Sequence, residues 1–371
     1  PMRVVRVVVL VLTGLFFVAL ASSGEVEPVW RVGAVAGLVS SAVAVRIVVE
    51  RERERMAFVA ADYWSVAAEL ARREGDTRAF SANVVALEGR KVAVGGDFAQ
   101  DASVRDGVVV LDESTAEQLA DELRAAAVTV TSVERRPHRQ RPSAPFTTST
   151  LQQEAGRKLR FSAQRTMRAA QGLYERGFIT YMRTDSTTLS SVAIDAARRE
   201  ITERYGAANL PDAPRTYKGK AKNAQEAHEA IRPAGERFTH PDQAAASAEV
   251  NRDMAAVYRL IWQRTIASQM TDATGETVTV RMAAPLRRWS EAELRTSGTV
   301  ITHQGFRLVY VEDTDDEDGG DDDERQLPQL TESDQLDVRQ VTPDGHRTKP
   351  PARYTEASLV KRLEELGVGR P

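Results

Sequence analysis

Apolar residues recur at helical spacing on both sides of a short hydrophobic run near the middle of the chain. Ahead of the run, positions three or four apart predict a helix that Ser162 caps and Gly177 ends, namely Ala163, Met167, Ala170 and Leu173. Beyond the run, the same spacing predicts a second helix up to Gly206, with Ile194, Ala197, Ile201 and Tyr205. The run is therefore expected to lie between two packed helices, which form a rigid mount for its side chains.

The run itself is too short to form a helix. It holds Phe178, Ile179 and Tyr181 and then turns polar. This pattern predicts a buried strand that breaks into a tight loop at residues 184–186. Side chains two residues apart on a strand project to the same side, so we expect Arg183 to lie beside Tyr181 at the edge of a cleft.

Strand-like runs lie on both sides of this helical region. Before it, residues 63–94 and 108–133 alternate β-rich runs with Gly and Asp turns, around one helix from Thr115 to Ala126 that Ser114 can cap. After it, strands are predicted at residues 276–282, 300–301 and 306–311. We therefore expect the helical region to be inserted between two halves of one strand-rich domain.

Three further stretches complete the organisation. Residues 135–145 are rich in Arg and Pro and are predicted to be an irregular hinge between domains. Residues 41–56 carry an apolar stripe between alternating charges, which predicts a helix. Near the end of the chain, Thr355 is predicted to cap a last helix that Gly367 ends.

The first residues allow two interpretations. Residues 7–21 are nearly all apolar and follow Arg3 and Arg6, which gives them the outline of a signal peptide or a short membrane anchor. They are fewer than the roughly twenty residues that cross a bilayer. Residues 4–45 also use few residue types and show no clear amphipathic period. The alternative is that part of residues 1–40 comes from a shifted reading frame or a fusion.

Composition narrows the classes of partner. The 371 residues suffice for two or three domains, and the formal net charge is −3, so a nucleic acid would have to meet local basic faces. One such face is predicted around the helix before the central run, with Arg157, Lys158, Arg160, Arg165 and Arg168. A solvated helix face is the default explanation of such charges. The sequence has no cysteine, which excludes disulfides and thiolate metal sites and favours the cytosol.

Tyr181 and Arg183 together suggest chemistry on phosphorus. A phenol with a pKa near ~10 is a poor nucleophile at neutral pH, and a fixed guanidinium favours its phenolate and can also hold a phosphate oxygen. The alternative is a half-buried packing tyrosine beside a surface arginine, which is the commoner outcome for an isolated Tyr-x-Arg.

The string around this pair decides between the alternatives. From Gly177 the chain is Gly-Phe-Ile-Thr-Tyr-Met-Arg-Thr-Asp-Ser-Thr-Thr-Leu. This string closely resembles the active-site signature of the type IA DNA topoisomerases, and Met182 is similar to the bacterial topoisomerase I branch of that family.

Three other places resemble the same family in the family's order. One is Gln-Glu-Ala-His-Glu-Ala-Ile-Arg-Pro, which contains His228 and Arg232, and another is the stretch from residue 350 to the end, which contains Arg370. The helix at residues 41–56 is similar to one that follows Ala-Gly-Arg-Val-Gln-Ser in the family. Here the preceding residues are Gly-Leu-Val-Ser-Ser, so the arginine of that motif is missing.

The resemblance implies a multidomain α+β fold, a type IA topoisomerase-like toroid fragment in which a strand-rich arch domain carries an inserted helical domain with the tyrosine. It implies ATP-independent single-strand breakage, strand passage and rejoining through a 5′-phosphotyrosine, which relaxes negative supercoils. Tyr181 would attack the phosphate and Arg183 would neutralise its growing charge. The DNA-binding residues would be Arg157, Arg165, Arg168, His228, Arg232 and Arg370.

The family also implies a Mg²⁺ ion bound by a toprim domain that lies upstream of anything in this sequence, so no metal-binding residue is assigned here. The acidic run at residues 312–324 contains Asp313-x-Asp315-x-Glu317, which mimics the toprim motif, and a solvated loop is the preferred interpretation. We expect an internal fragment that binds single-stranded segments of negatively supercoiled DNA but relaxes DNA poorly by itself. We also expect a monomer in the cytoplasm, associated with the nucleoid and without a stable membrane partner.

The resulting division is an atypical apolar segment at 1–40, a gate-domain helix at 41–60, the first half of the arch at 61–145, the inserted helical domain at 146–245, the second half of the arch at 246–345 and the start of the C-terminal gate region at 346–371. Two rival functions stay open. One is a catalytically silent single-stranded DNA-binding module, and the other is a membrane-anchored protein that uses residues 7–21.

Overall fold

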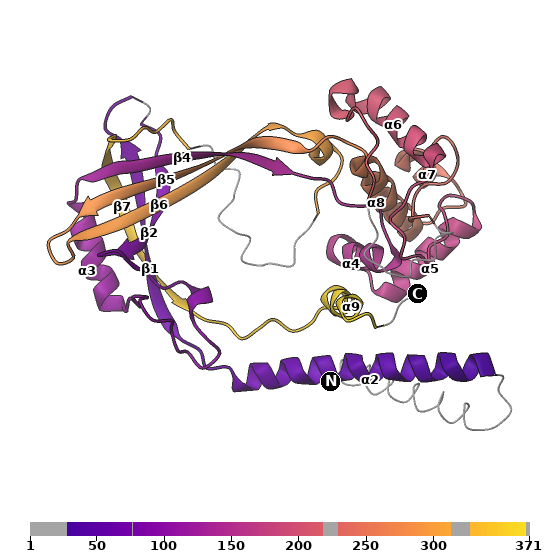
Figure 1. Ribbon diagram of the computed structural model, residues 1–371, viewed down its shortest axis with the longest axis horizontal. Coiled ribbons are helices and arrows are strands. Elements are labelled where there is room, and N and C mark those ends of the chain that lie inside the picture. Colours follow the sequence, from indigo (N-terminus) through magenta and orange to yellow (C-terminus); the bar gives the residue numbers. More distant parts are fainter. Residues whose placement is uncertain (1–27, 76, 218–228, 313–326, 369–371) are drawn as a thin grey trace.

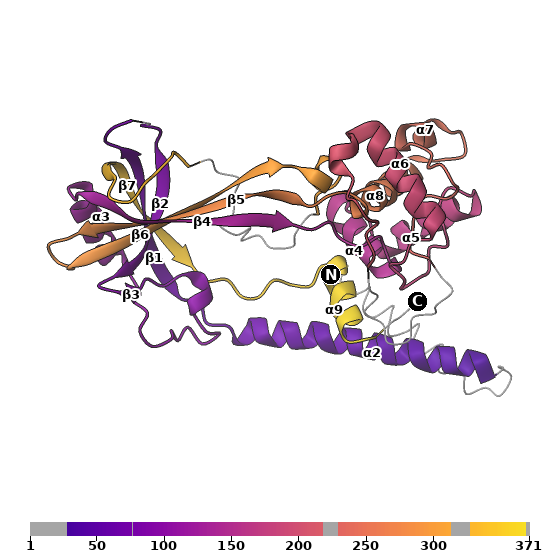
Figure 2. The same ribbon diagram turned by 45° about the horizontal axis from the view of Figure 1, so that its top comes forward.

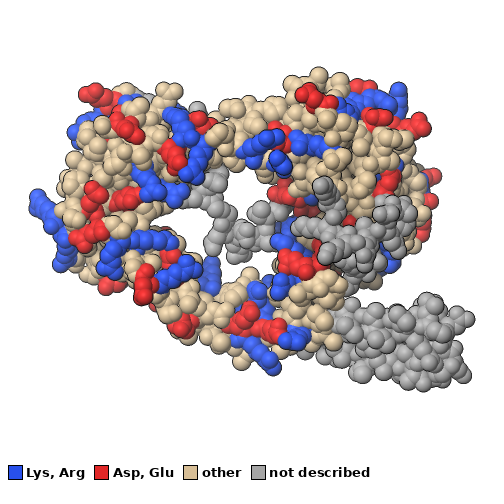
Figure 3. Space-filling model, viewed as in Figure 1, with Lys and Arg blue, Asp and Glu red and all other residues tan. Residues whose placement is uncertain are grey.

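The computed structural model describes residues 28–75, 77–217, 229–312 and 327–368. These residues form a ring (Figure 1). A strand-rich domain and a helical domain stand apart, long strands connect them on one side, and helix α2 (Pro28–Ala57) runs along the other. The view turned by 45° shows the same separation (Figure 2). The opening persists when all atoms are drawn, and Lys and Arg side chains alternate with acidic ones around it (Figure 3).

The strand-rich domain is a seven-stranded sheet within the described residues, in the order β1-β7-β4-β5-β6-β2-β3. The strands are β1 (Asp62–Arg72), β2 (Phe80–Leu87), β3 (Arg90–Lys91), β4 (Val128–Gln140), β5 (Ala273–Pro285), β6 (Glu291–His303) and β7 (Gln335–Arg347). Strand β1 also pairs with β2, so the sheet closes on itself. All the pairings between these strands are antiparallel.

Alternation of apolar and polar residues places one face of this sheet in a hydrophobic core. Val66, Met282 and Leu294 point into it and pack with Leu119 and Leu123 of helix α3 (Glu113–Arg124). The predicted helix is thus present, but the Asp112 carboxylate caps it, by accepting a hydrogen bond from the Thr115 N–H at 2.8 Å, and Ser114 does not. Two short 3₁₀ turns, η1 (Gly95–Asp97) and η2 (Ala207–Asn209), lie in the connections.

The hinge predicted at residues 135–145 is wrong for its first half, because residues 135–140 continue β4 and pair with β5. Beyond Val128 and Thr129, β4 has no second neighbour among the described strands. Pro137 lacks an N–H, and an edge strand tolerates that loss. The irregular connection to the helical domain is therefore confined to residues 141–147.

The helical domain is inserted between β4 and β5, as predicted. Its helices are α4 (Thr148–Leu159), α5 (Ala163–Glu175), α6 (Ser191–Tyr205), α7 (Pro241–Ala246) and α8 (Arg252–Ser268). They share one core, with Leu151, Leu173, Ile201 and Ile261 fully buried. Helix α8 lies in this core and packs on α5, so the boundary predicted after residue 245 divides a single packed unit.

One predicted strand is a 3₁₀ turn. Residues 306–311 follow β6 as η3 (Gly305–Leu308) and then an irregular segment. Gly305 has a φ of +51°, and a Cβ there would overlap the carbonyl oxygens of Thr271 and Asp272, so the chain turns where only glycine fits. Strand β7, which completes the sheet after this turn, was not predicted.

The last helix, α9 (Glu356–Glu365), follows the predicted cap Thr355 and packs on α4 at the edge of the opening (Figure 1). Gly156 allows this approach, because a Cβ on it would lie 3.3 Å from Ala357 Cβ.

Helix α2 begins at Pro28, ahead of the predicted start at residue 41. Within the described residues, no helix has the length and apolar composition of a membrane span. The apolar residues 7–21 lie outside the described residues.

Candidate active site

The chain reaches Tyr181 through a tight reversal at the end of α5. Gly177, at a φ of +72°, donates its N–H to the Tyr174 carbonyl, and Phe178 donates to the Leu173 carbonyl, both at 2.9 Å. These two bonds and the left-handed glycine form a Schellman motif. The motif turns the chain back along the helix, which explains why Tyr181 lies beside Tyr174, seven residues earlier.

The segment after the reversal is extended but is not a regular strand. Ile179 forms a single bridge with Pro233, and no ladder continues from it. The side chains nevertheless alternate, since Tyr181 and Arg183 are exposed whereas Met182 is buried. The tyrosine and the arginine therefore share the outer side of the segment, as predicted for a strand.

Thr148, at the start of α4, fixes the segment by hydrogen bonds. Its hydroxyl lies 2.9 Å from the Met182 carbonyl oxygen and 3.1 Å from that of Thr184, and it accepts the Thr184 N–H at 2.9 Å. The backbone N–H of Thr148 also donates to the Thr184 carbonyl at 2.9 Å. All of these groups are buried, so water cannot replace the bonds. The backbone on both sides of Arg183 is thereby tied to a helix end.

A second set of bonds holds the segment from the opposite side. Thr180 exchanges backbone and hydroxyl bonds with Arg232, each at 3.0 Å, and its hydroxyl also donates to the Ala230 carbonyl at 2.8 Å. The Arg232 guanidinium is bound to Glu229 at 2.6 Å, and Glu229 also accepts the N–H of Ser190, the α6 cap, at 2.6 Å. Burial alone would raise the pKa of Glu229, but the hydrogen bonds from Ser190 and Arg232 outweigh it and lower that pKa.

Tyr181 is accessible to a ligand, with 40 % of its surface exposed. Its ring lies 5.3 Å from the Tyr174 ring at an angle of 69°, an edge-to-face contact, and Tyr174 is 43 % exposed. Other tyrosines of this domain are packed inside it. Burial raises the pKa of Tyr217 to about 12, and it raises the pKa of Tyr258 further.

The structure divides the predicted basic residues into two groups. Arg168 and Arg183 are exposed, and neither forms an ion pair with a described residue. Arg165 is exposed but holds Asp253 through two bonds of 2.7 Å. Arg157 lies half-buried against Glu154, which is only 2 % exposed.

Arg232 is 8 % exposed, and its guanidinium donates to Glu229 and to the Pro233 and Gly235 carbonyls. Every described partner of the Arg232 guanidinium lies within the protein, so the DNA contact predicted for Arg232 would require this guanidinium to leave Glu229 and the two carbonyl groups. Sequence reasoning treated it as a surface cation since its partner Glu229 gave no separate signal.

Several predicted positions lie outside the described residues. These are His228, Arg370 and the acidic Asp313-x-Asp315-x-Glu317. Among the described residues, no group of three or more His, Asp or Glu side chains is arranged to hold a metal ion.

Sequence reasoning missed Thr148, Thr180, Tyr174 and Glu229. Each acts through a contact with a residue of the tyrosine segment or of its neighbours. Thr180 belongs to the string that identified Tyr181 but was given no role there, and the other three residues lie outside that string. The only local signal was the cluster of hydroxyl residues before α4, which predicts a helix cap and nothing more.

Comparisons with known proteins agree on one family. A family model described as DNA topoisomerase matches residues 31–371. The chain is 52% identical over 359 residues to the DNA topoisomerase 1 of Mycolicibacterium smegmatis, 53% over 342 residues to that of Streptomyces coelicolor and 48% over 344 residues to that of Synechococcus elongatus. These matches cover 94%, 91% and 91% of this chain but only 38%, 35% and 37% of those proteins.

The fold is similar to a solved structure. The full-length topoisomerase I from Thermotoga maritima matches with a TM-score of 0.63 at 29% sequence identity. The match covers 88% of this chain and 48% of that chain. The chain thus spans less than half the length of the proteins to which it is similar.

Proposed function

This chain belongs to the family of bacterial type IA DNA topoisomerases, and on that premise we propose that it carries the strand-cleaving tyrosine of such an enzyme. The single observation that supports the assignment most is the placement of Tyr181. The residue is exposed, it lies on the same side of its segment as Arg183, and the backbone around it is tied to α4 by buried hydrogen bonds. A packing tyrosine would need neither exposure nor such a mount.

In the proposed reaction, the Tyr181 oxygen attacks a backbone phosphorus of a single-stranded DNA segment. A new O–P bond forms as the bond between phosphorus and the 3′ oxygen breaks. The phenol loses its proton and the departing 3′ oxygen gains one, so the products are a 5′-phosphotyrosine and a free 3′-hydroxyl. One phosphodiester replaces another, so the 3′-hydroxyl can attack in reverse and restore the strand without ATP.

Arg183 is proposed to stabilise the negative charge that grows on the phosphate oxygens during attack. Arg168 is proposed to hold the DNA backbone as a point of positive charge, which makes binding salt-sensitive. Arg157 and Arg165 would contact DNA only if it displaced Glu154 and Asp253. Arg232 is proposed to position the tyrosine segment.

The family is Mg²⁺-dependent, and the described residues do not fit the ion, because they contain no cluster that could hold a metal. We propose that the ion is held by a toprim domain of the longer enzyme. A monomeric state, a preference for single-stranded segments and a cytoplasmic, nucleoid-associated location belong to the same proposal.

A chimera tests the proposal, with this chain in place of the matching segment of the Mycolicibacterium smegmatis relative. The chimera is expected to become covalently attached to a single-stranded oligonucleotide labelled at its 3′ end and to relax supercoiled plasmid with Mg²⁺. Tyr181→Phe should abolish both while oligonucleotide binding persists. A folded, DNA-binding chimera that forms no adduct would favour the catalytically silent binding module.

The isolated chain is expected to bind the same oligonucleotide and to relax plasmid poorly or not at all. Tyr181-dependent relaxation by the isolated chain would show that the residues needed for catalysis are all present in it. A size-exclusion measurement of the isolated chain tests the proposed monomer.

A further inference from the structure

A cavity of about 810 Å³ opens on the strand-rich domain, and its lining combines charged, aromatic and aliphatic side chains. Its charged residues lie on the face of the sheet opposite the hydrophobic core. Strand alternation shows the two faces directly. Met282 and Leu294 are fully buried in the core, whereas their neighbours Arg281 and Arg295 line the cavity. Asn83 lines it from β2. The cavity belongs to a different domain from Tyr181.

The floor of this cavity places two positive charges side by side. Arg281 of β5 and Arg295 of β6 are direct cross-strand partners, and Arg295 is also the partner of Asn83. Like charges directly opposite each other destabilise a sheet. Arg281 is paired with Glu293, whereas Arg295 forms no ion pair with a described residue. Asp344 also lines the cavity, so the positive charge that a bound anion would meet is concentrated at Arg295 and is not spread over the whole lining.

One wall of the cavity is aromatic. The rings of Tyr63 and His346 are stacked, with centroids 5.0 Å apart and planes 26° apart, and both residues line the cavity. The His346 Nε2 lies 2.7 Å from the Ser65 hydroxyl, and Phe98 packs on Tyr63 at 5.2 Å. The stacked rings are therefore fixed in orientation, and flat rings of this kind are a platform for stacking a nucleobase.

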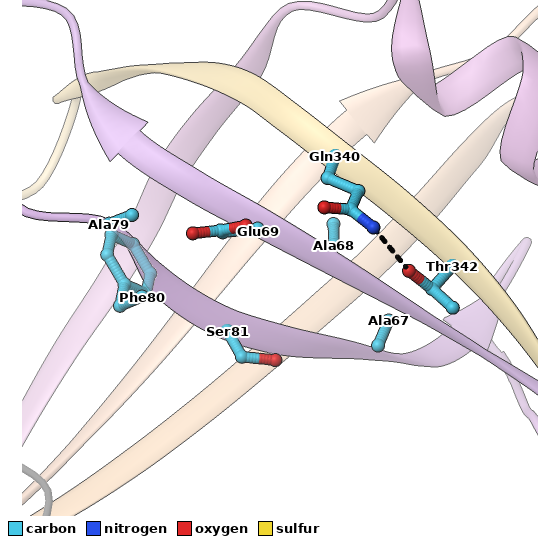
Figure 4. A pocket seen from close by; sticks show the side chains of 8 residues that line it. All are labelled: Ala67, Ala68, Glu69, Ala79, Phe80, Ser81, Gln340 and Thr342. Atoms are coloured by element: carbon cyan, nitrogen blue, oxygen red, sulfur yellow. Dashed lines mark hydrogen bonds between the residues drawn. The ribbon is translucent and has the colours of Figure 1, made fainter.

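A second cavity lies next to the first one. The lining of a neighbouring cavity of about 300 Å³ includes Ala67 and Thr342 (Figure 4), and both residues also line the first cavity. Gln340 donates a hydrogen bond to Thr342 at 3.4 Å there, and Glu69 lies at the same edge. A single small anion would need only Arg281 and Arg295. A groove that combines these cations with stacked rings and has a second polar cavity beside it fits a linear chain.

We propose that this groove, lined by Tyr63, Asn83, Arg281, Arg295 and His346, binds a short stretch of single-stranded nucleic acid. A backbone phosphate lies against Arg295, with Arg281 and Asn83 beside it, and an unpaired base stacks at the Tyr63–His346 rings. A paired base could not reach these rings, which selects single strands. The site holds DNA at a second point on the ring and does not depend on the chemistry proposed for Tyr181.

Photocrosslinking of the full chain with a short oligodeoxynucleotide that contains 5-iodouracil tests the proposal, because the cross-linked peptide identifies the site. Cross-links are expected at Tyr63 or His346 and should persist in Tyr181→Phe. Arg295→Gln should weaken binding at the groove by about tenfold, the loss typical of one charge-assisted hydrogen bond to a phosphate. Arg287→Gln, the same charge change in the β5–β6 turn outside the cavity lining, should leave the groove cross-link unchanged.

Glu293→Gln is a test of opposite sign, because it removes a carboxylate from the cavity and frees Arg281, so groove binding should tighten. A parallel titration of the chain with inorganic phosphate distinguishes a site for the phosphates of a nucleic-acid backbone from a site for free phosphate. The proposal is overturned if phosphate binds at Arg295 but no oligonucleotide cross-links there, since the site would then take a small anion only. It is also overturned if Arg295→Gln and Arg287→Gln have equal effects on the groove cross-link.

Discussion

Replacing Thr148 by valine should loosen the tyrosine segment without changing its shape, because valine has nearly the size of threonine but no hydroxyl. The change removes the group that bonds the Met182 carbonyl and the Thr184 N–H, both at 2.9 Å. The Thr184 carbonyl keeps its bond to the Thr148 N–H. Two buried polar groups are thus left unpaired.

Each unpaired buried group costs about 1–3 kcal/mol, so we expect Thr148→Val to lower the free energy of unfolding by about 2–4 kcal/mol after local relaxation. At roughly 3 °C per kcal/mol for a domain of this size, the melting temperature of the helical domain should fall by about 6–12 °C. Urea unfolding and thermal melting measure both. In the chimera, covalent attachment to DNA should fall more than DNA binding does, because the mount of Tyr181 is lost.

Thr166→Val is the matched control. Thr166 is fully buried in α5, and its hydroxyl donates only to the Ser162 carbonyl, which also accepts the Thr166 N–H. No group is left without a partner, so the loss should be under about 1 kcal/mol. Hydrogen exchange at the Thr184 amide should accelerate only in Thr148→Val. Equal stability losses in the two variants, or unchanged exchange at Thr184, would refute the role given to Thr148.

Three further predictions concern other parts of the structure. Tyr174→Leu should slow covalent attachment about 2- to 10-fold in the chimera, because it removes an edge-to-face ring contact worth about 0.5–1.5 kcal/mol. Tyr174→Phe keeps the ring and should restore the rate, so equal rates in both variants would contradict a role for the ring. Gly305→Ala should cost at least about 2 kcal/mol of stability, since its Cβ overlaps the Asp272 carbonyl at a positive φ, whereas Gly107→Ala, with open space, should cost only about 1 kcal/mol in the same urea titration. Glu229 has a lowered pKa in the folded protein, so its contribution to the free energy of unfolding is present above its ordinary pKa of 4.5 and is lost as the pH falls through the folded pKa. Glu229→Gln should therefore lower stability at neutral pH and flatten the acid side of the plot of stability against pH. An unchanged plot would count against the ion pair.

The elements that depend on near neighbours in sequence were predictable. The caps Ser162 and Thr355, the helices on either side of Tyr181 and most strands of the sheet follow from spacing and capping within a few residues. The insertion of the helical domain also followed from the order of the elements. The tyrosine string pointed to the family, because the agreement covers many consecutive residues.

Contacts between distant residues decided the rest. The sequence treats Pro137 as a strand breaker, but β4 is an edge strand there, and only the strand order reveals that. Arg232 resembles a surface cation until Glu229 and the carbonyl groups of Pro233 and Gly235 surround its guanidinium. Thr148 acquires its function from two carbonyls more than thirty residues away.

The sequence by itself therefore determined the local elements and singled out Tyr181 as the candidate nucleophile, because both depend on residues within a few positions of each other. Only the tertiary structure decided which cations stay free for a ligand, which hydroxyl mounts the tyrosine segment, and that Arg281 and Arg295 face each other across two strands. Burial and pairing are properties of the whole fold. A charged side chain is available to a ligand, or is already paired within the protein, according to which groups the packed chain brings within about 3–4 Å of it.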